Sequence, residues 1–405
     1  MTYRGSGDDD RIAKLMKKAL REQARNNRLE ASALFRKILG IDPSHLDAHY
    51  FLGTMCAEAR DYDRAKKHLE IARQIKPDSP MVLNNLAGVY RLAGDYAAAA
   101  TMYEKALALD PNLVEAHRNL GFLYAEAEQY DAAIRHYLRA AIFLPNSTDA
   151  LFGLAHAYMK ADNPASAEEY FKQVLALKPD HAEARHLLDA ITGTHSEHPP
   201  EQYVAGLFDN YADRFEEHLV NKLEYRVPEL LRKSVASVCG AGHRFSRVVD
   251  LGCGTGLAGE QIAPVTDVLV GVDLSARMLA HAKAKGIYDQ LHHQNIASFL
   301  ATDAGADLYL AADVLIYLGD LEPYFSALGN VALPGARFVF SVEDHSGDAG
   351  FVLKPTGRYA HSMTYLRALA EKHGFPVESI EAHVLRKEKQ TAIDGFVCCL
   401  RLRAG

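Results

Sequence analysis

The sequence predicts two unlike folds in one chain: an α-helical solenoid of tandem repeats, then an α/β domain with a doubly wound parallel sheet. Three observations lead to this prediction. Prolines recur every 34 residues in the first half, and short apolar segments alternate with helical ones in the second half. A glycine-rich stretch, VVDLGCGTGLAG at residues 248–259, follows the first of those apolar segments.

The repeats are visible as columns of residues with the same 34-residue step. The prolines are Pro43, Pro77, Pro111, Pro145 and Pro179. Twelve residues before each proline is an alanine: Ala31, Ala65, Ala99, Ala133 and Ala167. Four residues after each alanine is a bulky apolar residue: Phe35, Leu69, Tyr103, Tyr137 and Phe171. Small residues let antiparallel helices approach closely, bulky ones fill the space between repeats, and proline ends the second helix because it has no N–H group.

This pattern resembles that of the tetratricopeptide repeat family over about residues 12–179. The resemblance implies helix pairs stacked into a solenoid, with a concave groove that holds a peptide or a partner protein. The first repeat has Lys18-Ala19 in place of a Leu-Gly pair, as expected of an N-terminal cap, and the run at 182–191 is expected to be the closing cap. The expected groove column is Tyr50, Asn84, Arg118 and Phe152. A spacer or a dimerisation surface is the alternative use of the solenoid.

Composition limits the classes of function. Hydrophobic residues make up 48% and charged residues 24%, as in soluble globular proteins, and a net charge of −7 argues against a nucleic-acid surface. No run of about 18 apolar residues predicts a membrane span, and the start MTYRGSGDDD is unlike a secretory signal. The five cysteines form no CxxC pair, so we expect reduced thiols, a cytoplasmic location and no metal site.

Beyond the repeats, short apolar strands alternate with helices, which predicts a parallel sheet with helices on both faces. The expected strands are 247–251, 268–273, 291–295, 307–312 and 337–342. The expected helices are near 257–263, 276–285, 321–328 and 364–372. Two more strands, 377–385 and 396–402, lie close together in sequence, which predicts an antiparallel hairpin at one edge. The expected domains are a flexible tail at 1–11, repeats at 12–191, a linker at 192–202 and the α/β domain at 203–405.

The glycine-rich loop follows Asp250 at the end of the first strand. In a doubly wound sheet, ligands bind beyond the carboxyl ends of the strands, and bare glycine lets main-chain N–H groups approach them. A dinucleotide site has the spacing G-x-G-x-x-G, and its third glycine falls where this chain has Leu257. Here the glycines are Gly252, Gly254 and Gly256, with the spacing G-x-G-x-G.

The stretch DLGCGTG resembles motif one of the class I S-adenosylmethionine-dependent methyltransferases. Three other stretches, VDLSARMLAHAKAKG, DLYLAADVLIYLGDL and LPGARFVFS, are similar to segments of that family, and the resemblance spans roughly residues 203–403. It implies that Asp273 accepts hydrogen bonds from a ribose. It departs at Asn295, where the family usually has an acid that binds the adenine amino group; an asparagine oxygen can still accept that bond.

The resemblance implies S-adenosyl-L-methionine as the cofactor. The cofactor-binding residues it implies are Tyr211, Asp250, Gly252, Gly254, Gly256, Asp273, Leu274, Met278, Asn295, Ile296 and Asp313. Over its full length the chain resembles a bacterial group of tetratricopeptide-linked methyltransferases. In that group the segment at 203–219 is a lid, and an aromatic such as Tyr211 packs over the cofactor. The alternative is a docking helix whose aromatic side chains, Phe208, Tyr211 and Phe215, belong to the core.

Methyl transfer from a sulfonium is an in-line displacement, so alignment and exclusion of water matter most. A hydroxyl or ammonium acceptor also needs a base. By position, the candidates are His361, Tyr317 and Glu343. His361 is favoured because the resemblance places its loop over the substrate, although a solvated surface histidine is the plain alternative.

These observations predict a methyltransferase that modifies N or O of a protein or peptide recruited by the repeats. Two alternatives stay open. One is a small-molecule methyltransferase whose repeats serve assembly, and the other is a peptide-binding scaffold with a vestigial cofactor site. The sequence names neither the acceptor nor the oligomeric state.

Overall fold

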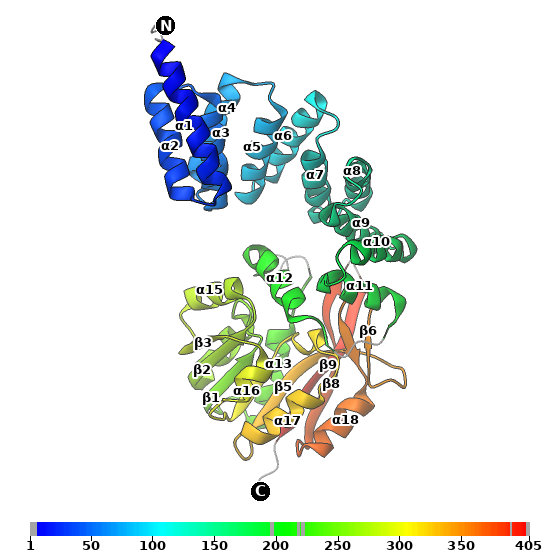
Figure 1. Cartoon of the computed structure of the whole chain (residues 1–405). Coiled ribbons are helices and arrows are strands. Elements are labelled where there is room, and N and C mark those ends of the chain that lie inside the picture. The colour runs from blue at the N-terminus through cyan, green and yellow to red at the C-terminus, as the bar shows by residue number, and fades with distance from the viewer. Residues whose placement is uncertain (1–5, 195–197, 217–218, 220–222, 389–390, 402–405) are drawn as a thin grey trace. The chain divides into compact units, whose positions relative to one another are not determined.

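The computed structural model describes residues 6–194, 198–216, 219, 223–388 and 391–401 (Figure 1). The chain divides into two compact units, Met1–Pro179 and Asp180–Gly405. No helix in the described part of the chain is long and apolar enough to cross a membrane. Residues 6–11, expected in a flexible tail, instead form the start of the first helix.

The first unit consists of helices in pairs. They are α1 (Ser6–Ala24), α2 (Arg28–Ile41), α3 (Leu46–Glu58), α4 (Tyr62–Ile75), α5 (Pro80–Leu92), α6 (Tyr96–Leu109), α7 (Val114–Glu126), α8 (Tyr130–Phe143), α9 (Thr148–Lys160) and α10 (Pro164–Leu177). Each column proline stands two residues after the end of a second helix, as Pro77 does after α4, because proline cannot continue the helix. This confirms the helical repeat predicted from the sequence.

The small and bulky columns pack as their sizes require. All five column alanines are fully buried. A Cβ atom on Gly53 would lie 2.6 Å from Cγ of Leu69, and one on Gly153 would lie 2.5 Å from the ring of Tyr137. Gly153 belongs to the repeat after that of Tyr137, so the tyrosine ring fills the space between neighbouring repeats.

The second unit begins with helices and continues as an α/β sheet. Its helices are α11 (Ala182–Thr192), α12 (Glu201–Tyr211), η1 (Ala212–Arg214), α13 (Val227–Cys239), α14 (Leu257–Ile262), η3 (Ala263–Val265), α15 (Ala276–Lys285), α16 (Ile296–Leu300), η4 (Leu315–Tyr317), α17 (Glu322–Val331) and α18 (Met363–Lys372). Its strands are β1 (Phe245–Leu251), β2 (Thr266–Asp273), β3 (Gln290–His293), β4 (Leu308–Ala311), β5 (Arg337–Asp344), β6 (Phe351–Leu353), β7 (Tyr359–His361), β8 (Val377–Glu388) and β9 (Thr391–Arg401).

Strand order is β3-β2-β1-β4-β5, all parallel, and β9 pairs antiparallel with β5 and with β8. The sequence predicted these seven strands and the hairpin; it did not predict α13 or the short strands β6 and β7. Glu343 of β5 pairs with Gly395 of β9 and with Ala360 of β7, so β7 and β9 lie on opposite sides of β5. The β6–β7 hairpin therefore stands beyond the carboxyl end of β4, on the side where ligands bind.

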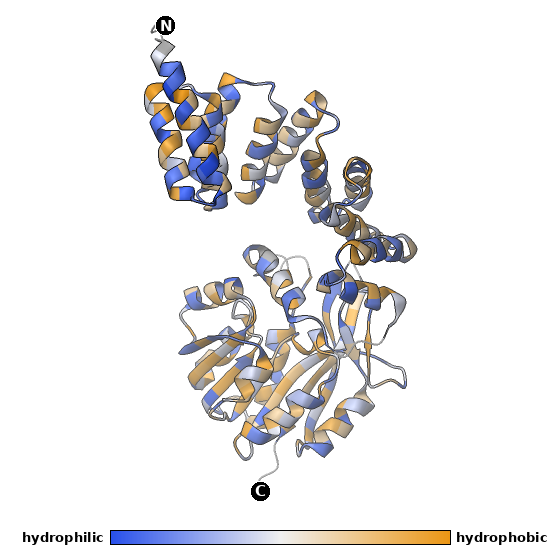
Figure 2. Ribbon diagram, in the orientation of Figure 1, coloured by the Kyte–Doolittle hydropathy of each residue, from blue (hydrophilic) through white to orange (hydrophobic). Residues whose placement is uncertain are grey.

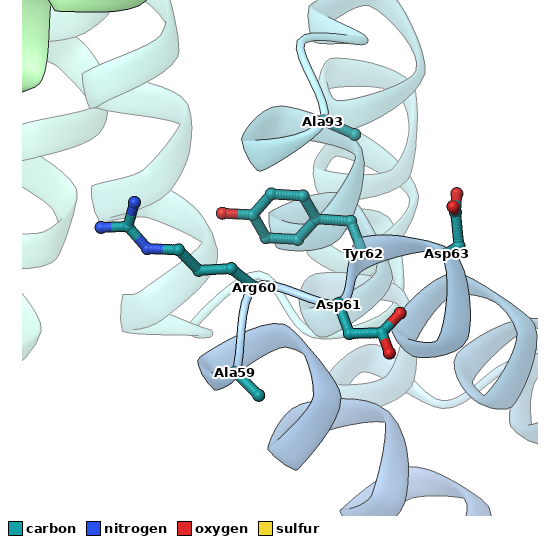
Figure 3. A pocket seen from close by; sticks show the side chains of 6 residues that line it. All are labelled: Ala59, Arg60, Asp61, Tyr62, Asp63 and Ala93. Atoms are coloured by element: carbon teal, nitrogen blue, oxygen red, sulfur yellow. The ribbon is translucent and has the colours of Figure 1, made fainter. Parts of the chain in front are cut away.

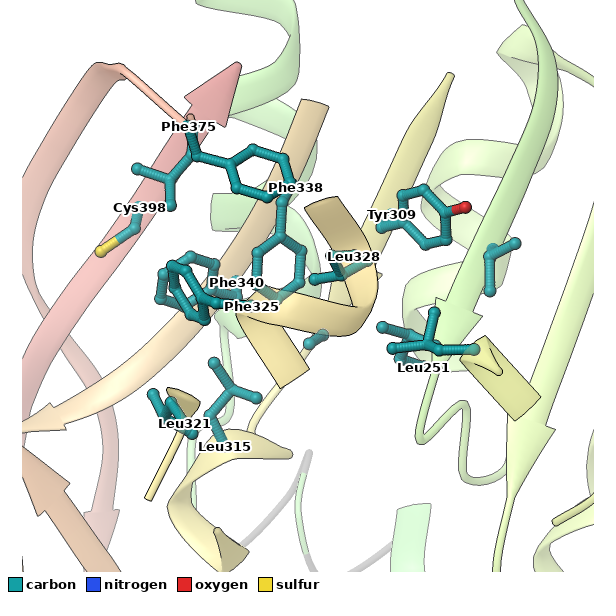
Figure 4. Close-up of a cluster of buried hydrophobic side chains, with 14 of the residues drawn as sticks. Leu251, Tyr309, Leu315, Leu321, Phe325, Leu328, Phe338, Phe340, Phe375 and Cys398 are labelled. Atoms are coloured by element: carbon teal, nitrogen blue, oxygen red, sulfur yellow. The ribbon is translucent and has the colours of Figure 1, made fainter. Parts of the chain in front are cut away.

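Two hydrophobic clusters cover the two faces of the sheet, whose strands are mostly hydrophobic in Figure 2. The larger cluster joins strand residues such as Phe338 and Phe340 to Phe325 of α17 and Phe375 (Figure 4). The other joins α13 and α14 to the opposite face. Cys398 belongs to the first cluster and Cys399 to the second, which confirms that these neighbours point to opposite faces.

Helix α11, which the sequence predicts to be the closing cap of the repeats, falls in the second unit. His186 of α11 forms a hydrogen bond from Nε2 to the carbonyl oxygen of Gly357, 2.9 Å away. The His186 ring also lies 4.8 Å from that of Tyr203 in α12. These contacts attach α11 to the loop before β7 and to the start of the expected lid.

Candidate functional site

The glycine loop joins β1 to α14 at the carboxyl edge of the sheet. Gly252, Gly254 and Gly256 have φ angles of 67°, 54° and 96°, which favour glycine. A Cβ atom on Gly252 would also lie 2.5 Å from Cγ2 of Val314. The main-chain conformation at these three positions, and the contact at Gly252, therefore favour glycine.

Asp250, at the end of β1, is a fully buried carboxylate. Its Oδ2 accepts a hydrogen bond of 2.7 Å from the hydroxyl of Tyr288, whereas its Oδ1 is buried without a hydrogen-bond partner. Burial raises the pKa of Asp250 from 3.8 to about 6, against the effect of the Tyr288 hydrogen bond. A donor or a cation near Oδ1 would lower the free energy of the ionised group.

Asp273, at the end of β2, ties two loops together. Its Oδ2 accepts from the N–H of Gly254 and its Oδ1 from the N–H of Ser275, each at 2.8 Å. Burial raises the pKa of this carboxyl group, and the two main-chain hydrogen bonds oppose that effect. Each oxygen keeps acceptor capacity for a further donor, such as a ribose hydroxyl.

Tyr288 is a site residue that sequence reasoning missed. Its hydroxyl bonds to Asp250, and its ring packs against glycines. A Cβ atom on Gly256 would lie 3.1 Å from this ring, and one on Gly271 would lie 2.9 Å from it. It also fills the space beside Gly259. This ring thus restricts the space at all three glycines, but it comes from the turn before β3, and no local motif marks it.

The other implied cofactor residues lie around the same edge. Leu274 accepts a 2.9 Å hydrogen bond at its carbonyl oxygen from Nε2 of His293. Met278 has no exposed surface, so it supports α15 from beneath. Ile296 is half-buried against the main core cluster.

Asn295 has both ends of its amide engaged. Its Oδ1 accepts from the N–H of Ser298 at 2.6 Å, which caps α16, and its Nδ2 donates to Oε1 of Glu201 at 2.7 Å. Glu201 is the first residue of α12 and was not a predicted site residue. The structure thus places a carboxylate next to the asparagine that replaces the expected acid.

The lid segment contacts the ends of three successive strands. Asp209 of α12 accepts a 2.5 Å hydrogen bond from the hydroxyl of Ser275, and Arg277 pairs with Asp213. Phe215 is the side chain closest to Gly254, 3.7 Å from where its Cβ would stand. Tyr211, the predicted aromatic, packs edge-on against Phe215 with ring centroids 5.4 Å apart. Phe215 therefore covers the loop directly, and Tyr211 supports it.

These residues fit a nucleoside that carries a positive charge. Asp250 has a buried oxygen without a hydrogen-bond partner. Asp273, at the end of the adjacent strand, has a carboxylate fixed by two main-chain N–H groups. The main chain of the glycine loop lies between them. Asp250, Asp273 and the loop would hold S-adenosylmethionine, because its sulfonium and ammonium groups supply the cation and its ribose supplies the donors.

The carboxylates beyond β4 and β5 are already paired with cations. Arg386, on β8, is 3% exposed and forms ion pairs with Asp313 at 2.6 Å, with Glu388 at 2.8 Å and with Glu343. Arg358 pairs with Glu343 at 2.9 Å and with Glu388 at 2.6 Å. We call these residues, with Lys354, the arginine network.

Asp313, predicted to bind the cofactor, belongs to this network. Its main chain has a φ of 53°, rare for a residue with a side chain, and its Oδ1 accepts from the hydroxyl of Ser341 at 2.9 Å. Glu343 is 1% exposed. Burial alone would raise the pKa of Glu343, but Arg386, Arg358 and Lys354 hold it below its usual value. Neither carboxylate is a free base.

His361 lies in strand β7 rather than in a loop, and it is fully buried. Its Nε2 lies 3.0 Å from the carbonyl oxygen of Gly319, which can only accept, so Nε2 carries the proton. The basic atom is therefore Nδ1, which is buried without a hydrogen-bond partner. Burial lowers the pKa of His361 to about 4, so the ring is neutral at pH 7.

Tyr317 is the last residue of the short helix η4, which begins directly after Val314. Its ring packs edge-on against Phe208 of the lid helix, with centroids 5.1 Å apart. Burial raises the pKa of its hydroxyl, although Arg358 and Arg386 oppose this. Tyr317 is thus a neutral wall between the lid and the β6–β7 hairpin.

A shallow open hollow lies in the repeat unit, at the turn between α3 and α4 (Figure 3). It is lined by Ala59, Arg60, Asp61, Tyr62, Asp63 and Ala93. Asp61 there is the N-cap of α4 and accepts from the N–H of Arg64 at 3.1 Å. Across the described ranges, no group of three His, Cys, Asp or Glu side chains is placed to hold a metal ion.

Comparison with known proteins divides the chain in the same way. The tetratricopeptide repeat family matches residues 22–87 and 125–191, and a second TPR repeat family matches residues 88–127. The methyltransferase domain family matches residues 249–340. The chain thus combines tetratricopeptide repeats with a methyltransferase domain.

Several curated relatives are methyltransferases. A probable S-adenosylmethionine-dependent methyltransferase of Mycolicibacterium smegmatis is 28% identical over 32% of this chain and 52% of its own length. A ubiquinone biosynthesis O-methyltransferase of Aromatoleum aromaticum is 30% identical over 25% of this chain and 45% of its own length. The chain therefore spans about half the length of the curated relatives it matches. Among solved structures, the TPR protein YrrB is 23% identical with a TM-score of 0.37, over 42% of this chain and 89% of its own.

Proposed function

We propose that the protein is an S-adenosylmethionine-dependent methyltransferase that modifies N or O of a protein or peptide bound by the repeats. The observation that carries the proposal is the glycine loop flanked by the buried carboxylate of Asp250 and the partly buried carboxylate of Asp273, within a domain that matches the methyltransferase family. Dinucleotide chemistry is disfavoured because Leu257 stands where that motif needs its third glycine.

S-adenosylmethionine supplies, when bound, a methyl group on a positively charged sulfur that leaves readily. The chain then has to align the acceptor and exclude water. Asp273 orients the ribose, and Phe215 covers the loop from the lid side. A lone pair on the acceptor N or O forms the new bond to carbon as the carbon–sulfur bond breaks, and the acceptor proton goes to a base or to water.

His361 is the proposed base, acting through Nδ1. It is neutral at pH 7, and its Nε2–H bond to Gly319 holds the ring in one orientation. Glu343 is a less suitable base because its cation partners stabilise its ionised form. With a pKa of about 4, His361 is a weak base, so it suits an acceptor that loses its proton easily.

The repeats are proposed to bind the acceptor. First helices of neighbouring repeats carry polar side chains that contact one another: Asn85 Nδ2 donates to the hydroxyl of Tyr50 at 2.6 Å, and Arg118 pairs with Asp149 at 2.9 Å. Such groups can hold the main chain and the carboxylates of an extended peptide.

A cytoplasmic location of the protein also stays a prediction.

A methyl-transfer assay with the full chain and a peptide library tests recruitment. Arg118→Ala is expected to raise KM for a peptide acceptor about tenfold and to leave kcat unchanged, because it removes binding but no chemistry. The matched control is Lys172→Ala, which removes another exposed ion pair, with Glu168, from a second helix. Equal KM for both variants and the wild type would rule out recruitment at this column.

A small-molecule O-acceptor is the second candidate, supported by the names of relatives: the ubiquinone biosynthesis enzyme and a malonyl-[acyl-carrier protein] O-methyltransferase of Enterobacter lignolyticus, 27% identical over 35% of this chain. In that case the wild type would methylate phenols or carboxylic acids, and Arg118→Ala would leave KM unchanged.

A further inference from the structure

Residues 201–215, which comprise α12 and the described residues that follow it and are called the lid below, run across the sheet in a fixed order. Glu201, at its start, is hydrogen-bonded to Asn295 after β3. Asp209, two helical turns on, is bonded to Ser275 after β2. Phe215, at its end, lies over Gly254 after β1. Because β3, β2 and β1 are neighbours in that order, the segment runs across the carboxyl ends of these three strands, where a nucleoside would bind.

This order assigns Glu201 to one end of the ligand. A ribose on Asp273 occupies the end of β2, and the part of the ligand held by the glycine loop occupies the end of β1. The base must then extend the other way, past β3, since Asp273 of β2 pairs in register with His293 of β3. Asn295 and Glu201 are the polar side chains that meet there.

The two side chains differ in what they can offer. Asn295 uses Oδ1 as a helix cap and Nδ2 as a donor to Glu201. Glu201 is exposed, and a carboxylate has about four acceptor sites, so the bond at Oε1 leaves capacity for another donor. An exocyclic amine is such a donor, whereas an oxo group at the same position is not.

We propose that Glu201, from the lid, recognises the amino group of the adenine base and sets the specificity of this site for adenosyl over other purine nucleosides. This rests on the proposed cofactor. Asn295 is a positioning residue: its amide holds the carboxylate over the base. The lid thus supplies the acid that the loop after β3 lacks.

Calorimetric titration of the full chain with two ligands tests the proposal. One is adenosylhomocysteine, and the other is its purine analogue, which has hydrogen in place of the 6-amino group. The wild type is expected to bind adenosylhomocysteine about tenfold more tightly, the size of one hydrogen bond to a charged group. Glu201→Gln keeps an oxygen to accept from Asn295 but removes the charge, and it is expected to lose most of this preference by weakening adenosylhomocysteine alone.

Two further variants separate recognition from attachment of the lid. Asp209→Asn weakens the other lid anchor and is expected to weaken both ligands equally. Glu201→Gln with Asn295→Asp exchanges the amide and the carboxylate, so it is expected to restore the preference for adenosylhomocysteine. If Glu201→Gln weakens both ligands equally, or neither, Glu201 does not read the base and the proposal is wrong. If the wild type binds neither ligand, the proposed cofactor itself is wrong.

Discussion

At the ends of β1 and β2, the carboxylates of Asp250 and Asp273 accept hydrogen bonds from neutral donors, whereas at the ends of β4 and β5, Asp313 and Glu343 are paired with arginine. The effect on ionisation is opposite: burial raises the pKa of Asp250, and the cations hold that of Glu343 low. The half of the site at β1 and β2 thus has carboxylates without a cation partner among the described residues, which a positively charged ligand can pair with. In the other half, arginine already compensates the carboxylates, so that half supplies no free carboxylate.

The largest effect is expected in the compensated half. Arg386→Met removes the cation shared by Asp313, Glu343 and Glu388 and leaves buried charge uncompensated. We expect a loss of about 3–5 kcal/mol in the free energy of unfolding, measured with urea. The control is Arg401→Met, because Arg401 is half-exposed, lies 3.7 Å from Glu378, and should cost less than about 1 kcal/mol. Equal stability of the two variants would mean that the network is not electrostatically important.

Asp250 should make the free energy of unfolding depend on pH. Between the unfolded pKa of 3.8 and the folded value of about 6, the native protein keeps a proton that the unfolded chain releases. The contribution of Asp250 to stability therefore falls as pH rises through this window, by up to about 3 kcal/mol. The stability of Asp250→Asn, relative to wild type, should rise from pH 4 to pH 6 and then level off. A difference that is flat with pH would show that Asp250 titrates normally.

The glycine loop allows a comparison at equal backbone conformation. Gly252 and Gly286 have φ angles of 67° and 66°, but only at Gly252 would a Cβ atom meet a neighbour, Val314. Gly286→Ala should cost about 1 kcal/mol from strain alone. Gly252→Ala should cost about 1–3 kcal/mol and should also abolish adenosylhomocysteine binding, as followed by calorimetry. If Gly252→Ala still binds adenosylhomocysteine, the loop does not contact the ligand.

Tyr288→Phe should have the smallest effect. It deletes the 2.7 Å hydrogen bond to Asp250 but keeps the ring that packs against the glycines. We expect a loss of about 1 kcal/mol and a further rise in the pKa of Asp250, readable from the carboxyl carbon in NMR titrations. An unchanged pKa would mean that this hydroxyl does not stabilise the ionised form.

Local patterns explain which features were predictable. The 34-residue columns and the seven main strands follow from proline position, residue size and alternation, which act over short stretches, and the structure agrees with them. The glycine loop and Asp250 belong to one short motif. Tyr288, Glu201 and Arg386 could not be found in that way, because each reaches the site from a distant segment and gains its role only through tertiary contact.

The same reason accounts for the misplaced elements. The resemblance implies a loop around His361, whereas residues 359–361 form β7, which pairs with β5 and β6. His361 is therefore a buried ring with one proton position and not a residue of an exposed loop. The resemblance implies Tyr211 as the aromatic over the cofactor, and only the path of the lid shows that Phe215 is the ring nearest to Gly254.

The central claim is that the half of the site around Asp250 and Asp273 accepts a sulfonium nucleoside. Parallel calorimetric titrations of the full chain with S-adenosylmethionine and with NAD test it most directly. We predict saturable, one-to-one heat with S-adenosylmethionine, weakened in Asp250→Asn, and none with NAD. Saturable binding of NAD with no response to S-adenosylmethionine would contradict it.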